Sequence, residues 1–206
     1  MISSPKIRLS VVLVLGLSLI MALPATAKKK PKNPDDLFNP MLGPDYAQWL
    51  VGPIVEIATA KEVERFLELI SDEEAEGFVA QFWEKRNEGT PVFQKTPQQV
   101  YDQRVEEADK RYSEGAYPGS RTDRGKVFIL YGEPESVEYE AQDRIDDPTL
   151  EVWYYPKETP EGLDGEQPDG RYRFIKVDGA TFLYSGRNMR RDFRDELKRR
   201  RTGWSG

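Results

Sequence analysis

The sequence predicts an α+β fold, in which N-terminal helices pack on a mostly antiparallel β-sheet and a basic C-terminal helix follows. Three observations support this prediction. Helix-capping patterns recur between residues 59 and 115, β-rich segments follow one another from residue 126 onward, and an Asp-Gly pair separates the last two of these segments. Helices that precede consecutive strands are typical of an antiparallel sheet with its helices gathered on one side.

The composition excludes several classes of chemistry. The chain has 206 residues with no cysteine and no histidine, and its net charge is −6. Disulfides, thiolate or histidine metal sites, and Ser-His or Cys-His catalysis are therefore excluded, and we expect no cofactor. Residues 41–186 contain 16 basic and 31 acidic residues, a net charge of −15. Because such a body repels phosphate backbones, we expect no nucleic acid partner.

Residues 1–27 are typical of a secretory signal peptide. Two basic residues precede an apolar run over residues 9–23, and small residues around Ala27 offer a cleavage site. This run has 15 residues, whereas a membrane-spanning helix needs about 20. The sequence therefore favours cleavage near Ala27 and export to the periplasm or the exterior over a retained N-terminal anchor.

The remaining chain divides into three parts. Residues 28–44 are rich in proline and lysine and are typical of a linker. Residues 45–186 hold the predicted α+β domain, and residues 187–206 form a basic tail with eight Lys and Arg.

Within that tail, residues 187–201 predict a basic helix with a narrow apolar stripe. Met189, Phe193 and Leu197 recur at every fourth position. Four interpretations stay open for this segment: weak contact with an anionic membrane, contact with an acidic partner, packing against the acidic body of the same chain, or fraying.

Capping patterns predict the starts of three helices between residues 59 and 115. A hydroxyl residue is followed three positions later by Glu or Gln in each case, and apolar residues at helical spacing come after it. The capping pairs are Thr59 with Glu62, Ser71 with Glu74, and Thr96 with Gln99. Just before them, the brief apolar stretch 54–57 predicts a strand.

Consecutive strands are predicted in the second half of the domain. The β-rich segment 126–131 predicts the first strand, which ends at a Gly-Glu-Pro turn. The further predicted strands are 136–141, 151–155, 172–177 and 181–184. Asp178-Gly179 predicts a hairpin between the last two, and the Gly- and Pro-rich segment 157–170 predicts a loop.

Several segments occur in the order typical of the bacterial GWxTD-domain proteins, and the sequence resembles that family over about residues 46–186. The segments are 46–50, 66–67, 72–74, 82–86, 119–134 and 151–155. One difference concerns the motif that gives the family its name, because Ser120 stands where the family usually has tryptophan. The resemblance implies an exported envelope protein of a family without an established activity, and it brings no catalytic residues.

The segment around this motif is the main candidate site, which we call the motif loop and interpret as structural or binding. Its residues are Gly119, Arg121, Thr122, Asp123, Arg124, Gly125, Gly132, Glu133 and Pro134. We expect Thr122 and Asp123 to accept hydrogen bonds from their own turn and Arg124 to pair with a helix carboxylate. At the two ends of one strand, Asp123 and Glu133 would lie about 20 Å apart, too far for the paired acids of glycoside hydrolysis.

Aromatic residues suggest a second candidate, a surface platform for a ligand. Trp83 and Arg86 are three positions apart on one helix, and Trp153 and Tyr155 share one face of a predicted strand. Packing in the core explains the same pattern. The acidic stretches 143–147 and 164–169 contain oxygen ligands suited to calcium but lack the spacing of a calcium loop, so we predict no metal site.

These observations predict a non-enzymatic protein-interaction or structural module of the bacterial envelope, with an envelope protein or glycan as its partner. The alternatives are a carboxylate-dependent hydrolase and a glycan-binding protein acting on envelope polysaccharide. An enzyme should gather at least two acids in one deep pocket, whereas a binding module should expose an apolar or aromatic patch.

Overall fold

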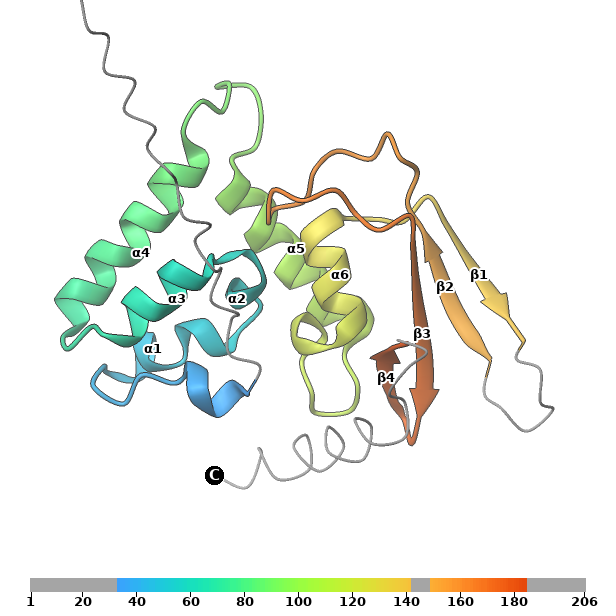
Figure 1. The fold of residues 1–206 in the computed structure, drawn as a ribbon, viewed down its shortest axis with the longest axis horizontal. Helices are drawn as coiled ribbons and strands as arrows, with labels where there is room; N and C mark the ends of the chain where they lie inside the picture. The colour runs from blue at the N-terminus through green and yellow to red at the C-terminus, as the bar shows by residue number, and fades with distance from the viewer. Residues whose placement is uncertain (1–32, 142–148, 185–206) are drawn as a thin grey trace, which may run out of the picture.

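The computed structural model describes residues 33–141 and 149–184 of the chain and confirms the α+β class. Within these residues, six α-helices precede a four-stranded antiparallel sheet (Figure 1). The predicted signal peptide, the first five residues of the predicted linker, the acidic stretch 143–147 and the predicted basic helix lie outside the described residues.

The strands form a simple meander in which each strand pairs with the next, in the order β1-β2-β3-β4. The helices are α1 (Pro44–Ala47), α2 (Ile54–Ile57), α3 (Ala60–Leu67), α4 (Asp72–Asn87), α5 (Pro97–Tyr112) and α6 (Asp123–Tyr131). The strands are β1 (Ser136–Glu140), β2 (Leu150–Tyr154), β3 (Arg171–Val177) and β4 (Ala180–Leu183).

The predicted caps begin α3, α4 and α5. The Thr59 hydroxyl accepts from the Glu62 N–H at 3.3 Å, and the Thr59 N–H donates to the Glu62 carboxylate at 2.7 Å. The same reciprocal pair begins α5 at Thr96. In α4, Ser71 caps as predicted, but the Glu74 carboxylate accepts from the N–H of the residue before Ser71. Side-chain caps of this kind satisfy the N–H groups that a helix start leaves unpaired.

Two segments that the sequence predicts as strands are helices. Ile54–Ile57 forms the single turn α2, whose two isoleucines are buried. Lys126–Tyr131 belongs to α6, in which Val127, Phe128 and Ile129 are all buried. A short apolar run buried on several sides does not reveal a helical period, so its pattern alone does not separate a helix from a strand.

The predicted hairpin is confirmed. Asp178 and Gly179 have φ values of +51° and +83°, which join β3 to β4 with Val177 opposite Ala180. Positive φ at both central residues defines the turn type whose twist matches that of the paired strands.

Three apolar clusters make up the core. Helices α1 to α4 pack on one another around Leu50 and Phe66. Helices α5 and α6 pack against one face of the sheet, where Trp153 and Phe174 are buried, and the other face has a cluster of its own around Val152. Figure 1 shows α5 and α6 between the N-terminal helices and the sheet. The helices that cover the sheet are therefore α5 and α6.

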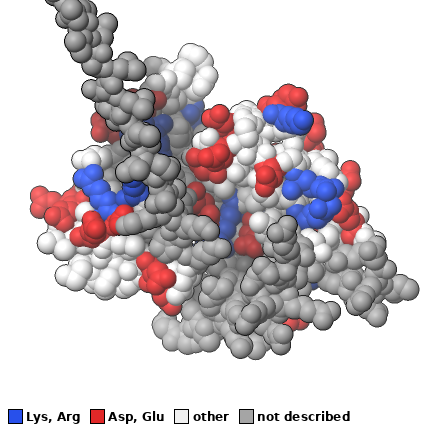
Figure 2. Space-filling view, viewed as in Figure 1, with Lys and Arg blue, Asp and Glu red and all other residues white. Residues whose placement is uncertain are grey.

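Charged side chains are mixed over the visible surface. On the face drawn in Figure 2, acidic and basic groups are interspersed over the described helices and strands. Among the described residues, no helix combines the length and apolar character needed to cross a membrane.

Candidate functional site

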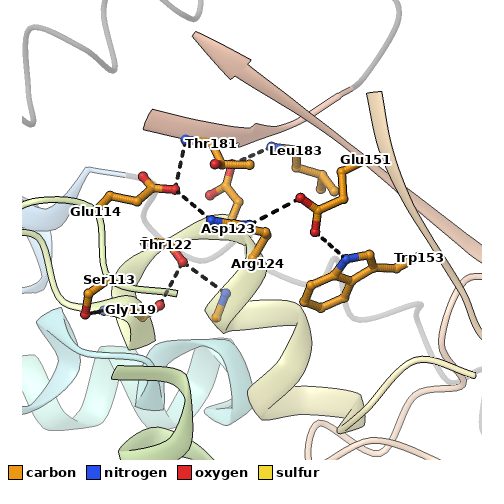
Figure 3. Close-up of polar contacts among 11 residues, drawn as sticks. Ser113, Glu114, Gly119, Thr122, Asp123, Arg124, Glu151, Trp153, Thr181 and Leu183 are labelled. Carbon is orange, nitrogen blue, oxygen red and sulfur yellow. Dashed lines mark hydrogen bonds and ion pairs between the residues drawn. The ribbon is translucent and has the colours of Figure 1, made fainter. Parts of the chain in front are cut away.

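Residues 119–125 of the motif loop lie between α5 and the first turn of α6, whereas Gly132, Glu133 and Pro134 follow the end of α6. Its first part is the 3₁₀ turn Gly119–Arg121, and Thr122 is the N-cap of α6. Figure 3 shows the polar side chains of this region reaching the end of α5 and the strands β2 and β4. The sequence predicts a strand after this loop. The structure has the helix α6 there instead, and the loop holds this helix against the sheet.

Two glycines of the motif loop allow backbone segments to touch. A Cβ atom on Gly119 would lie 1.9 Å from the Ala108 carbonyl oxygen of α5. A Cβ on Gly125 would lie 1.8 Å from the Gly119 carbonyl oxygen. Real Cβ atoms do not come so close to backbone oxygens, so any larger residue would push α5, the 3₁₀ turn and α6 apart.

The Thr122 side chain hydrogen-bonds backbone groups of its own turn, which confirms the expectation for this residue. Its side chain is fully buried, and its hydroxyl donates to the Gly119 carbonyl at 2.8 Å and accepts from the Gly125 N–H at 3.1 Å. The hydroxyl therefore donates one hydrogen bond to the backbone and accepts another from it.

Replacing Thr122 with valine should lower the free energy of unfolding by about 2 kcal/mol, because the shape is kept while the buried Gly125 N–H loses its acceptor. Urea denaturation measures the change. The control is Thr122→Ser, which keeps the hydroxyl and should lose less than half as much. Equal losses for valine and serine would show that the methyl group, and not the cap, matters.

Asp123 does not bind its own turn, contrary to the expectation. Its Oδ2 accepts from the Leu183 N–H of β4 at 2.7 Å, and Glu114 accepts from the Thr181 N–H of the same strand at 2.9 Å (Figure 3). In an antiparallel edge strand, alternate N–H groups point away from the neighbouring strand. The two carboxylates therefore occupy outward N–H groups of β4, and this edge of the sheet is closed to further strands.

Arg124 connects α6 to the sheet. It pairs with Glu151 of β2 at 3.2 Å and with Glu114 at 3.7 Å, and Glu151 also accepts from the Trp153 indole N–H at 2.7 Å. The predicted pairing with a helix carboxylate is wrong, because the partners lie in β2 and just after α5. All of these groups are used to hold α6, β2 and β4 together.

Sequence reasoning missed the acids that receive these bonds. Asp109 accepts from the Ser120 N–H at 2.7 Å, and Glu114 and Glu151 bind as described above. One signal was present: Asp109 lies in the last turn of α5, where the helix dipole disfavours an acid. An acid at such a position indicates a partner elsewhere in the fold. Ser120 itself is buried at 5% exposure in the place of the family's tryptophan.

The second part of the motif loop ends α6. Gly132 has a φ of +81° at the helix C-terminus, and Glu133 pairs with Arg111 of α5, with one of the two contacts at 2.8 Å. The hydrogen bond from Arg111 lowers the pKa of the Glu133 carboxyl. Beside this pair is a hollow of about 330 Å³, to which Arg104 and Glu107 also contribute.

Asp123 and Glu133 do not form a catalytic pair. The eight helical steps from Asp123 to Tyr131 span about 12 Å along the axis of α6, shorter than the predicted strand distance but already beyond the range for glycoside hydrolysis. One carboxylate accepts from β4, whereas the other pairs with α5.

The predicted surface platform is wrong, because its aromatic rings are in the core. Trp83, Trp153 and Tyr155 are 7%, 2% and 3% exposed. Trp83 packs against Phe82, and the Arg86 guanidinium lies 3.5 Å from the Phe82 ring centre. These side chains are covered by neighbouring helices and leave no flat aromatic surface for a ligand.

Arg86 instead joins three helices. It donates to Glu62 of α3 at 2.8 and 3.0 Å, to the Ile57 carbonyl of α2 at 3.0 Å and to the Phe82 carbonyl of its own helix at 3.1 Å. Desolvation alone would raise the pKa of the Glu62 carboxyl. The hydrogen bonds from Arg86 and from the Thr59 cap outweigh it and lower this pKa to about 2.

In the acidic loop 164–169, the Asp164 carboxylate is hydrogen-bonded to groups of the same chain. The Asp164 carboxylate accepts from the Tyr131 hydroxyl and from the Glu166 N–H, both at 3.1 Å. In residues 33–141 and 149–184, no group of three or more acidic side chains has an arrangement that would hold a metal ion.

Comparison with known proteins gives one family. The family model described as the GWxTD domain matches residues 43–174. The match extends from the residue before α1 into β3, so it includes all of the motif loop and ends before β4. No curated protein and no solved structure matches the chain.

Proposed function

Because the chain belongs to the GWxTD domain family, we propose that it is an exported protein of the bacterial envelope that acts as a non-enzymatic interaction or structural module. The observation that supports this proposal is that the polar side chains of the motif loop bind other groups of the same chain. Thr122, Asp123 and Arg124 bind backbone groups or carboxylates of the chain itself. Side chains occupied in this way hold elements in place and are not free to act on a substrate.

The state of Glu133 also favours a non-enzymatic role over a carboxylate hydrolase. A general acid needs a raised pKa so that it carries a proton at neutral pH. The ion pair with Arg111 does the opposite and lowers the pKa of Glu133. Near neutral pH this carboxylate therefore stays ionised.

We assign partner contact to the outer edge of β1. In the part of the chain that the structure describes, β1 pairs only with β2, and its side chains Val137 and Tyr139 are 44% and 71% exposed. The opposite edge, at β4, is closed by Asp123 and Glu114. An extended segment of another envelope protein can add to an open strand edge by backbone hydrogen bonds.

Photocrosslinking in bacteria tests both parts of the proposal. With a photoreactive residue in place of Tyr139, we expect a discrete protein adduct in the envelope fraction, carried by a chain shortened near Ala27. The matched position is Glu158, which is also exposed but lies in the loop before β3, and it should give no such adduct. Equal labelling from both positions would contradict contact at β1.

A pair of leader variants controls for export. Leu15→Arg places a charge in the middle of the apolar run and should leave the chain uncleaved in the cytoplasm, whereas Ser4→Arg adds the same charge before the run and should not. An unshortened wild-type chain in the cytoplasm would overturn the envelope assignment, whatever the crosslinking shows.

A further inference from the structure

The face of the sheet that points away from α5 and α6 carries a buried apolar patch on β2, β3 and β4, beside charged residues of β1 and β3. We call Leu150, Val152, Ile175, Ala180 and Phe182 the outer sheet face. Their exposed fractions are 5%, 0%, 2%, 8% and 5%. The partly buried apolar residues that the described chain packs against them are Tyr154, Val177 and Tyr184, which belong to the sheet or directly follow it.

The described helices do not supply the cover for this face. Val152 and Trp153 point to opposite sides of β2, because neighbouring residues of a strand alternate. Trp153 belongs to the cluster that α5 and α6 complete, whereas Val152 does not. A sheet with two buried faces needs a layer on each. Over β2, Arg173 of β3 reaches across to Glu140 of β1, so these two side chains cover Leu150 and Val152. Over β3 and β4, the described residues that pack against Ile175, Ala180 and Phe182 belong to the sheet or directly follow it, so the layer there comes from outside the described residues.

Connectivity favours the C-terminal segment as this layer. Tyr184, the last described residue, packs against the outer sheet face, and the chain continues from there for 22 residues. Residues 142–148 offer a single large apolar side chain, Ile145, and residues 1–27 are the predicted cleaved leader. The tail, in contrast, carries the apolar stripe Met189, Phe193 and Leu197.

The dimensions of the stripe and the face agree. Eight helical positions from Met189 to Leu197 span about 12 Å. Along β4, this face runs from Ala180 through Phe182 to Tyr184, four strand steps or about 13 Å. The charges also favour contact between the tail and the rest of the chain, because residues 187–206 carry a net charge of +5 and residues 41–186 carry −15.

We propose that residues 187–201 dock on the β3 and β4 part of the outer sheet face of their own chain, with Met189, Phe193 and Leu197 against Ile175, Ala180 and Phe182. The sheet then has helices on both faces. The basic groups of the tail point outward over the acidic body.

Disulfide trapping tests the proposal, because the chain has no native cysteine. In the full chain without its leader, Ile175→Cys with Phe193→Cys should form an intramolecular disulfide on mild oxidation. The matched pair is Ile175→Cys with Asp195→Cys, whose tail position lies on the opposite side of the expected helix. We expect the first pair to close at least ten times faster.

A second cysteine position on the sheet and a second measurement keep the test independent of any one variant. Phe182→Cys replaces Ile175→Cys if the latter folds poorly. With cysteine at position 193 alone, a water-soluble maleimide should react at least ten times more slowly than with cysteine at position 195. Equal maleimide reaction, disulfides only between chains, or protection appearing only with anionic lipid vesicles would each overturn the proposal.

Discussion

Replacing Gly125 with alanine is expected to lower the free energy of unfolding by about 3 kcal/mol or more. The added Cβ would lie 1.8 Å from the Gly119 carbonyl oxygen and 2.7 Å from its carbon. Both atoms belong to the backbone of a turn that is itself pressed against α5, so neither side moves easily. Alanine gains about 1 kcal/mol in helix propensity over glycine, which does not offset such a clash.

Gly77→Ala is the matched control for this prediction. Gly77 also lies inside a helix, α4, but a Cβ there would meet no atom within 4 Å. That variant should be more stable than the wild type by about 0.5–1 kcal/mol. Urea denaturation of the two variants therefore gives changes of opposite sign. A stabilised Gly125→Ala protein would show that the 3₁₀ turn and α6 are not in tight contact.

Replacing Arg86 with methionine is expected to cost about 3–5 kcal/mol of stability. Methionine keeps much of the aliphatic packing but leaves the Glu62 carboxylate, only 17% exposed, without its cation. The Ile57 carbonyl loses its donor as well. Removing one partner of a buried ion pair costs more than removing both, because the remaining charge stays desolvated.

The double variant Arg86→Met with Glu62→Gln separates these effects. Glutamine keeps the capping box at the start of α3, because its amide oxygen can still accept from the Thr59 N–H. It carries no charge, so the double variant should recover at least half of the stability lost in Arg86→Met. No recovery would mean that the unpaired carboxylate is not the cause of the loss.

The same pair predicts how stability depends on pH. The pKa of Glu62 is lowered to about 2 from an ordinary value of 4.5. A carboxyl with a depressed folded-state pKa contributes its full stabilisation above pH 4.5 and loses it as the pH falls toward 2. Between these values, the urea midpoint should fall more steeply for wild type than for Glu62→Gln. Parallel curves would contradict the assigned pairing.

Local signals in the sequence account for what was predicted correctly. The capping box at Thr59 and the Asp178-Gly179 turn each depend on a few neighbouring residues, and both are present as expected. The residues of Lys126–Tyr131 favour β-structure and predict a strand, yet Thr122 caps a helix there. Its apolar residues are buried on several sides, and such burial removes the period that marks a helix.

Distant partners account for what was not predicted. Asp123 binds an N–H that is 60 positions away, and Arg124 binds a carboxylate that is 27 positions away. No local pattern reports such contacts. Trp83 and Arg86 do lie three positions apart on one helix, but spacing on a helix does not tell which face is buried. Only the packing of α2, α3 and α5 around α4 placed them in the interior.

Amide hydrogen exchange at Leu183 is the most direct test of a structural role for the motif loop. If Asp123 holds the edge of β4, Asp123→Ala should speed exchange of the Leu183 N–H at least tenfold in NMR experiments. The exchange rate of the Thr181 N–H, which donates to the Glu114 carboxylate, should change far less. Unchanged exchange at Leu183 in a folded Asp123→Ala protein would contradict this role, because the carboxylate would then be free for other chemistry.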